Sequence, residues 1–324
     1  MGIQKHVGLT GNPIAHSLSP VIHTTAYAAL GLKWEYSLYP CCDAIEFRAL
    51  IERLACSQDE HIGLNVTMPF KAVAFQTAEK ITGLAASAAG AANVLIFEAA
   101  GKGSQSAITA ANTDGAGIVG FLKRVAHVRI SGVDAIVCGT GATSTAAIVE
   151  LVLAGASSIV VLSREVAQAQ KCIGRIEAAL DSSGGFEAGM GVAKRCVLIA
   201  GSYGALDALE AFCQSSTLII DATPVGMNPN DAPLIPVEFI TSSHTVLDVV
   251  YGFGETRLVR EARARSARAF DGVGMLVEQA ALSIELWAAA QGCPCEAPRD
   301  IMHKAALDEL DLRVGNRIFM SPQT

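Results

Sequence analysis

Two residues of opposite charge stand in short polar segments of the kind that bind small ligands. Lys71 ends the segment Gly63-Leu-Asn-Val-Thr-Met-Pro-Phe-Lys71, and Asp114 ends Asn112-Thr-Asp114. A lysine offers three hydrogen-bond donors on a compact charge, and a carboxylate can orient it and accept from a neighbouring hydroxyl. Taken singly, a lysine after proline indicates a solvated helix start, and Asn-Thr-Asp indicates a helix cap. On these residue types alone, Lys71 and Asp114 are candidates for proton transfer at a bound ligand.

A glycine-rich turn provides a candidate site for a dinucleotide. The segment Gly139-Thr-Gly141-Ala142-Thr143-Ser144 follows an apolar strand and opens an apolar helix. The first glycine permits the tight turn, and the second lets a pyrophosphate approach the backbone. The helix N-terminus supplies amide donors and a favourable dipole. The strand–turn–helix–strand context makes the motif more specific than its glycines alone, the alternative being a plain tight turn.

The end of the next strand bears on the choice between NAD and NADP. An acidic residue there binds the ribose 2′-hydroxyl, whereas an arginine binds a 2′-phosphate. The chain has Ser163, Arg164 and Glu165 at this point. Arg164 favours NADP. The carboxylate of Glu165 leaves NAD possible, because it would repel the phosphate.

The first half of the chain has the alternating pattern of an α/β layer with a mainly parallel sheet. Ser19 and Pro20 predict a helix start, with Ser19 in the capping position and Pro20 at the first helical one. The other expected elements are strands at 3–10, 34–39, 61–66 and 93–97 and helices from 43 to 56 and from Pro69-Phe-Lys71 onward.

The second half predicts a Rossmann-type unit. Its expected strands are 135–138, 158–163, 196–200, 218–222 and 246–250, with a loop at 182–191 and long helices from 274 onward. The fold class is therefore α/β, with an N-terminal α/β substrate-binding domain and a doubly wound dinucleotide-binding domain. We expect the first domain to comprise residues 1–113 plus 272–324, and the second 114–271.

The composition of the chain limits the classes of partner and ligand that we expect. The net charge of −7 without a basic cluster argues against nucleic acid. The uncharged stretch 81–97 is too short and polar to cross a membrane, and no secretory signal begins the chain. Nine scattered cysteines fit reduced thiols in the cytoplasm. Cys293-Pro-Cys295 with His303 fits no zinc spacing, so we expect no metal.

Taken together, these segments resemble the shikimate dehydrogenase family. Its G-x-P-I-x-H-S-x-S-P, G-x-N-V-T-x-P-x-K and N-T-D patterns occur here in order. Three later segments resemble the family as well, and the resemblance runs from residue 8 to about residue 290. They are Asp221-Ala-Thr223-Pro224-Val-Gly-Met227, Asp248-Val-Val-Tyr251 and Gly272-Val-Gly274-Met275-Leu-Val-Glu-Gln279.

The resemblance implies an NADP-dependent oxidoreductase of chorismate biosynthesis that reversibly reduces 3-dehydroshikimate to shikimate. It implies that Ser17 and Ser19 bind the substrate carboxylate with Tyr251 nearby, and that Lys71 and Asp114 are the catalytic pair. The remaining implied substrate ligands are Thr67, Asn93, Thr113 and Gln279. The implied cofactor ligands are Gly139, Gly141, Ala142, Thr143, Ser144, Ser163, Arg164, Thr223, Pro224, Gly274 and Met275, although Met275 also fits a core position.

Several alternatives stay open. Ala142 replaces a family glycine, Ser163-Arg164-Glu165 replaces Asn-Arg-Thr, and Asp221 stands where asparagine is common. A quinate/shikimate dehydrogenase that uses NAD fits nearly as well, and a non-catalytic ligand-sensing relative is the rival from another class. A folate-type dehydrogenase would not explain Ser17 and Ser19. Lys71 acts either as a proton shuttle or as a fixed cation. We expect a cytoplasmic monomer or homodimer.

Overall fold

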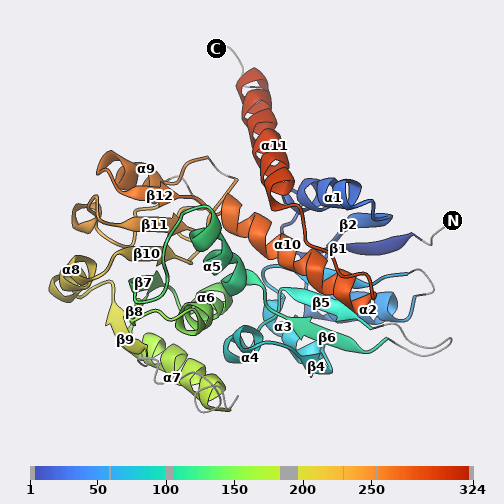
Figure 1. Cartoon of the computed structure of the whole chain (residues 1–324), viewed down its shortest axis with the longest axis horizontal. Coiled ribbons are helices and arrows are strands. Elements are labelled where there is room, and N and C mark those ends of the chain that lie inside the picture. The colour runs from blue at the N-terminus through green and yellow to red at the C-terminus, as the bar shows by residue number, and fades with distance from the viewer. Residues whose placement is uncertain are drawn as a thin grey trace. The chain divides into compact units, whose positions relative to one another are not determined.

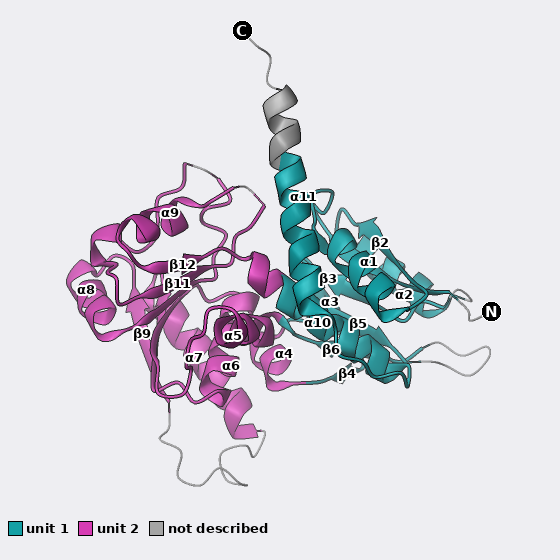
Figure 2. Cartoon of the chain, turned by 45° about the horizontal axis from the view of Figure 1, so that its top comes forward, with its two compact units in different colours: residues 1–82, 91–113, 277–324 teal, residues 83–90, 114–276 magenta. Residues whose placement is uncertain are grey.

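Two units of α/β structure make up the chain (Figures 1 and 2). A computed structural model describes residues 4–57, 60–98, 106–182, 196–228, 230–252 and 254–320, without the side chains of 314–320. Unit 1 contains residues 1–82, 91–113 and 277–324, and unit 2 contains 83–90 and 114–276. Relative to the predicted domain limits, 83–90 and 272–276 fall in the other unit. Apart from Ser182, the loop expected at 182–191 lies outside the described residues.

The sheet of unit 1 has six strands in the order β2-β1-β3-β5-β6-β4. Neighbouring strands are parallel except that β5 runs antiparallel to both β3 and β6. β4 and β6 are absent from the prediction because strands of two and four residues carry little periodicity. The strands are β1 (Lys5–Gly11), β2 (Trp34–Pro40), β3 (Gly63–Val66), β4 (Lys80–Ile81), β5 (Val94–Phe97) and β6 (Ile108–Ala111).

A side-chain cap explains where α2 of unit 1 begins. The Asp43 carboxylate accepts the amides of Ile45 and Glu46 and caps α2 (Ala44–Ala55), a helix that the sequence predicts from 43 to 56. The predicted Ser19 cap of α1 (Ser19–Leu30) is wrong, because Leu18 holds the cap position and Ser19 is already helical. α3 (Lys71–Thr77), α10 (Val273–Ala290) from Val277 onward and α11 (Arg299–Met320) complete the helices of this unit.

The alternation of side chains along β3 separates an apolar face from a polar one. Leu64 and Val66 pack with α2 and α3 in a buried cluster. Asn65, between them, points to α10 and donates to Ser283 Oγ at 2.9 Å. Gly63 lies so close to the Trp287 indole that a Cβ there would be 2.2 Å from Nε1. Because residue 63 is glycine, α10 can pack directly against β3 at this position.

Unit 2 has a six-stranded parallel sheet in the order β12-β11-β10-β7-β8-β9, the doubly wound arrangement that the sequence predicts. Its strands are β7 (Asp134–Cys138), β8 (Ser158–Ser163), β9 (Val197–Ser202), β10 (Leu218–Asp221), β11 (Thr245–Asp248) and β12 (Arg268–Phe270). Its helices are α4 (Leu84–Ala89), α5 (Asp114–Arg124), α6 (Ala142–Leu153), α7 (Val166–Ser182), α8 (Leu206–Ser215), η1 (Val237–Phe239) and α9 (Arg257–Ala264).

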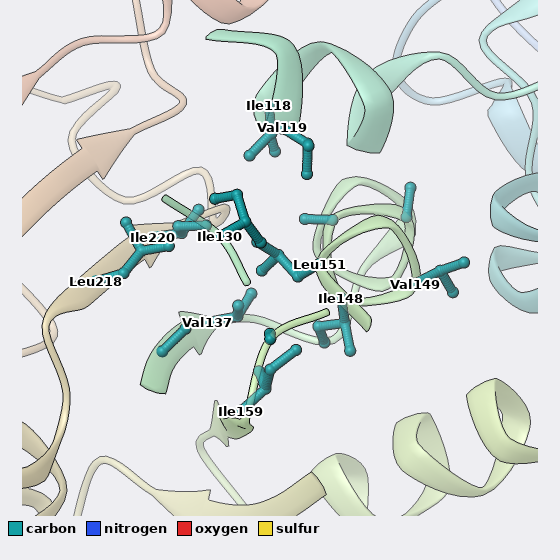
Figure 3. Close-up of a cluster of buried hydrophobic side chains, with 14 of the residues drawn as sticks. Ile118, Val119, Ile130, Val137, Ile148, Val149, Leu151, Ile159, Leu218 and Ile220 are labelled. Carbon is teal, nitrogen blue, oxygen red and sulfur yellow. The ribbon is translucent and has the colours of Figure 1, made fainter. Parts of the chain in front are cut away.

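Alternate residues of each central strand in unit 2 pack into different apolar layers. Val137 and Ile220 pack with α5, α6 and α7 in the cluster drawn in Figure 3. Ile136 and Ile219, one position earlier, pack with α8 and α9 on the opposite face. Because both faces are covered, these strands read as unbroken apolar runs.

One helix among the described residues, α10, has the length and hydropathy of a membrane span. In the folded chain 72% of its residues are buried. It also carries Glu278 and Glu285, which bind Arg299 at 2.8 and 2.7 Å. These features are those of a core helix.

Gly115 on α5 should be intolerant of any side chain. A Cβ at this position would lie 2.1 Å from the Ala146 carbonyl oxygen on α6, so the two helix backbones would have to separate. We expect Gly115→Ala to lower the free energy of unfolding by about 1–3 kcal/mol, measured by denaturant titration.

Gly174→Ala is the matched control, because Gly174 is also helical but has no atom within 4 Å of the position that a Cβ would occupy. There the substitution should stabilise the protein by about 0.5–1 kcal/mol. Equal effects at the two glycines would contradict the close-packing explanation.

Candidate active site

The serine segment expected to bind an anion lies between β1 and α1 in unit 1. The Ser17 hydroxyl accepts the amide of Ser19 at 3.1 Å, and the Ser17 amide donates to the Ile14 carbonyl at 3.0 Å. Ser17 is partly exposed and Ser19 is buried. Because the Ser17 oxygen already accepts a hydrogen bond, its own O–H is the group that remains to donate to a ligand.

The turn after β3 holds Thr67 and Lys71. The Thr67 amide donates to the Thr10 carbonyl at 2.9 Å, and the Lys71 carbonyl accepts the Ala92 amide at 2.9 Å. A Cβ on Gly11 would lie 2.2 Å from the Thr67 methyl, so only glycine lets this turn lie against the end of β1. Thr67 and Lys71 are partly exposed. Backbone hydrogen bonds therefore fix both ends of the segment that carries Thr67 and Lys71.

A buried hydrogen-bonded cluster joins Asn93, Thr113 and Gln279, which are far apart in the sequence. The Asn93 amide nitrogen donates to Thr113 Oγ1 at 3.0 Å and to Gln279 Oε1 at 3.1 Å. Its oxygen accepts the Thr113 amide at 2.8 Å, and the Thr113 hydroxyl contacts the Gln279 carbonyl at 3.1 Å. All three side chains are at least nine-tenths buried. Unit 1 thus brings together three predicted substrate ligands.

Asn65 supports this cluster, and the sequence analysis gave it no role of its own. Its amide nitrogen donates to the Asn93 carbonyl at 3.3 Å and to Ser283 Oγ at 2.9 Å, and its oxygen accepts the Tyr36 hydroxyl at 2.9 Å. The Ser283 hydroxyl in turn donates to the Gln279 carbonyl at 2.9 Å. The available signal was an asparagine inside an otherwise apolar strand.

Asp114 begins α5 and belongs to unit 2. It is buried, and its carboxylate accepts the Thr143 hydroxyl from the first turn of α6 at 2.9 Å. The contact becomes possible because α5 and α6 approach closely at Gly115. A predicted catalytic residue is therefore oriented by a residue of the predicted nucleotide turn.

The turn from β7 into α6 fits the phosphates of a dinucleotide. Gly139 has φ +102°, and a Cβ there would lie 2.6 Å from Ser144 Oγ. Gly141 caps α6 without a side chain, and its Cβ position opens onto space with no atom within 4 Å. A ligand can thus approach the first turn of α6, whose amides and dipole attract anions. Ala142 and Thr143 form that turn and are partly exposed.

The end of β8 presents Arg164 to solvent. Ser163 is buried, and its hydroxyl donates to the Glu165 carbonyl at 2.5 Å. The Ser202 hydroxyl donates to the Arg164 carbonyl at 3.0 Å. The backbone of this segment is fixed by serines on both sides, while the guanidinium is exposed. Ser163 therefore has a structural hydrogen bond within the segment.

Some of the other predicted ligand-binding residues of unit 2 are exposed or partly exposed, and others are packed in the core. Tyr251 and Thr223 are partly exposed and Pro224 is exposed. Met275 lies in the apolar cluster of unit 2, in agreement with the core alternative. A Cβ on Gly274 would lie 2.2 Å from the Phe121 ring, which explains the glycine by packing. Among the described residues, no group of three or more His, Cys, Asp and Glu side chains could hold a metal ion.

Two buried carboxylates end neighbouring strands of unit 2. Asp221 and Asp248 are register partners on β10 and β11. Thr223 donates to Asp221 from its amide at 3.0 Å and from its hydroxyl at 2.7 Å, and Thr256 donates to Asp248 at 2.7 Å. Burial raises the pKa of the Asp221 carboxyl to about 7, with a further contribution from Asp248. Burial also raises the pKa of Asp248.

The sequence is similar to known shikimate dehydrogenases over most of its length. Residues 9–95 match the model of the shikimate dehydrogenase substrate binding domain. The NADP(+) shikimate dehydrogenase of Methanopyrus kandleri is 32% identical over 94% of this chain and 95% of its own. That of Caulobacter vibrioides is 33% identical over 86% of this chain and 87% of its own.

Solved structures agree on the architecture. The shikimate 5-dehydrogenase of Listeria monocytogenes, in complex with shikimate and NAD, has a TM-score of 0.77 and 28% identity, covering 94% of this chain and 96% of its own. A 5-ketofructose reductase of Gluconobacter has a TM-score of 0.72 and 23% identity, covering 94% of this chain and 98% of its own. The second likeness shows the fold alone.

Asp221 should make the stability of the fold depend on pH. Its folded-state pKa of about 7 lies above the ordinary value of 3.8. The folded chain therefore keeps a proton that the unfolded chain releases, and the associated stability is lost as the pH rises through 7. We expect Asp221→Asn to gain about 2–3 kcal/mol relative to wild type between about pH 5 and about pH 8.

Urea unfolding of both proteins at the two pH values measures this difference. Asp181→Asn, at an exposed carboxylate on α7, controls for the loss of one charge. A gap between Asp221→Asn and wild type that stays constant with pH would show that Asp221 does not bind the proton.

Proposed function

The chain belongs to the shikimate dehydrogenase family, and we propose that it catalyses the reversible, NADP-linked reduction of 3-dehydroshikimate to shikimate. The observation that carries this proposal is the buried Asn93–Thr113–Gln279 cluster. It joins three segments whose side chains the family resemblance assigns to one substrate. An amide, a hydroxyl and a second amide provide both donors and acceptors, which suits a ring with several hydroxyl groups.

The proposed substrate contacts follow from the donors and acceptors of each residue. Ser17 and Ser19 bind the carboxylate, because hydroxyl groups can donate to its oxygens and Ser17 has its O–H to give. Tyr251 adds a phenolic donor to the same group. Thr67, Asn93, Thr113 and Gln279 bind the ring hydroxyls, together with the catalytic pair.

Lys71 and Asp114 are the proposed catalytic pair. The ketone oxygen gains negative charge during reduction, and Lys71 Nζ donates to it and supplies the proton of the new hydroxyl. Asp114 accepts a hydrogen bond from the substrate, and the Thr143 hydroxyl holds its carboxylate in one orientation. In the oxidative direction Lys71 takes the proton back.

The chain offers a site for NADP in unit 2. The turn from Gly139 to Ser144 would hold the pyrophosphate, Arg164 would bind the 2′-phosphate, and Ser163 would position that arginine. Bound NADPH supplies the hydride. Thr223 and Pro224 are the proposed neighbours of the nicotinamide, whereas packing accounts for Gly274 and Met275. We propose that the protein acts in the cytoplasm, as a monomer or homodimer.

Lys71→Ala should lower kcat for shikimate oxidation by about a hundredfold to ten-thousandfold, because the proton donor and acceptor is lost. The fold should be intact, since Lys71 is partly exposed at the start of α3. Steady-state kinetics and a thermal melt measure both effects.

Lys80→Ala is the matched control, because Lys80 is an exposed lysine of the same unit that pairs with Glu98 at 2.8 Å. It should retain wild-type kcat. A decrease below tenfold in Lys71→Ala would remove Lys71 from the catalytic pair. Tight shikimate binding by the wild-type protein without turnover would instead support a ligand-sensing role.

The preference for NADP over NAD should depend on Arg164. We expect wild type to use NADP more efficiently, and Arg164→Ala to reduce the ratio of kcat/KM for NADP to that for NAD by about tenfold to a hundredfold. Activity with shikimate and with quinate, each with NAD and NADP, measures the ratio. Arg260→Ala, at an exposed arginine on α9 of the same unit, is the control.

Wild-type activity with NAD equal to that with NADP would overturn the role of Arg164. Quinate turnover at the rate of shikimate, with NAD preferred, would identify a quinate/shikimate dehydrogenase. Glu165 is the observation that favours that second function, because a carboxylate beside Arg164 opposes a 2′-phosphate.

A further inference from the structure

The C-terminal helix places an arginine on the loop that carries Ser17. We propose that Arg313, on α11, is a positioning residue that holds the carboxylate-binding loop in its binding conformation. The inference rests on the proposed function, because it assigns a support to the Ser17 anion site. Arg313 lies outside the sequence motifs on which the proposed function is based.

Three hydrogen bonds fix the guanidinium of Arg313. Nη1 donates to the His16 carbonyl at 2.7 Å, and Nη2 donates to the Ser17 carbonyl at 3.4 Å. Nε donates to Glu309 Oε1 at 2.8 Å, one helical turn earlier on α11. The planar fork therefore spans two consecutive carbonyl groups, which a single ammonium could not do with the same geometry.

The loop depends on this support because its own hydrogen bonds are few. Residues 12–18 lie between β1 and α1 and contain neither helix nor strand. Apart from those of Arg313, the described bonds of these residues are the Asn12 amide to the Met68 carbonyl, the Ser17 amide to Ile14, the Ser19 amide to Ser17 Oγ and the Ile22 amide to the Leu18 carbonyl. None of them restrains the carbonyl groups of His16 and Ser17. The guanidinium restrains both, and these peptide planes determine where the Ser17 side chain points.

Electrostatics gives Arg313 a second effect on an anion. Carbonyl oxygens carry partial negative charge, and those of His16 and Ser17 border the proposed carboxylate site. Arg313 directs N–H donors at both oxygens, so it offsets part of the repulsion that a bound carboxylate would meet, although Glu309 balances its charge.

The position of α11 makes this contact stable. α11 packs along α1, the helix that starts at Ser19, and Figure 1 shows the two side by side. Arg313 and Glu309 keep 31% of their side-chain surface exposed, so their ion pair contributes little to folding. Removing Arg313 should therefore disturb the loop without unfolding unit 1.

Arg313→Ala should raise KM for shikimate by about tenfold, because charge-assisted contacts to the loop are lost. It should leave kcat within about threefold and KM for NADP unchanged. Arg313→Lys should raise KM for shikimate by about threefold, since one carbonyl keeps a donor. Lys304→Ala, which removes an exposed ion pair with Asp308 on the same helix, is the control and should match wild type.

Steady-state kinetics, thermal melts and shikimate binding by fluorescence provide the readouts. Unchanged KM in both Arg313 variants, with wild type active on shikimate, would overturn the role of Arg313 and leave the proposed function intact. Equal losses in kcat, KM for both ligands and melting temperature would show a merely structural contact and also overturn it. A wild-type protein inactive on shikimate with either cofactor would refute the proposed function instead.

Discussion

The need to satisfy buried polar groups governs the arrangement of unit 1. Asn65 and Asn93 bring two side-chain amides into the interior, where each unpaired donor or acceptor would cost about 1–3 kcal/mol. Their partners come from β2, from the end of β6 and from α10, so satisfying the amides aligns all three. A cluster that is fully paired only in one arrangement is rigid. Rigidity of this kind suits side chains that must hold several hydroxyl groups at fixed positions.

Unit 2 depends on close approach. Gly115 lets α5 lie against α6, and this contact brings Asp114 within a hydrogen bond of Thr143. At the carboxyl edge of the sheet, the register that pairs Asp221 with both Cys138 and Asp248 places two acids beside the glycine turn. The hydrogen bonds that Thr223 donates to Asp221 then hold Thr223 near Gly139. Packing in unit 2 therefore determines where its buried carboxylates lie.

Function in this architecture resides in side chains more than in the fold. A 5-ketofructose reductase shares the fold at 23% identity, so the fold alone does not select shikimate. The relatives from Methanopyrus and Caulobacter share about a third of their residues with this chain over most of its length. The assignment of the family rests on them. The proposed roles of individual residues rest on the chemistry of Ser17, Lys71 and Asp114.

The α/β class, the doubly wound unit 2 and the positions of most strands could be predicted from the amino-acid sequence. Apolar periodicity and glycine turns are local signals, so these features can be predicted without knowledge of distant contacts. Lys71, Asn93, Asp114 and Gly139 are predicted site residues, because each stands in a short segment of recognisable chemistry.

Which distant residues contact one another could be known only from the folded chain. Asn65 with Ser283, Asn93 with Gln279 and Arg313 with Ser17 are separated by 218, 186 and 296 positions, and no local pattern names such partners. The short strands β4 and β6 and the assignment of 83–90 to unit 2 were likewise settled by packing. The physical reason is that a side chain's hydrogen-bonding capacity is written in its type, whereas its partner depends on how the whole chain packs.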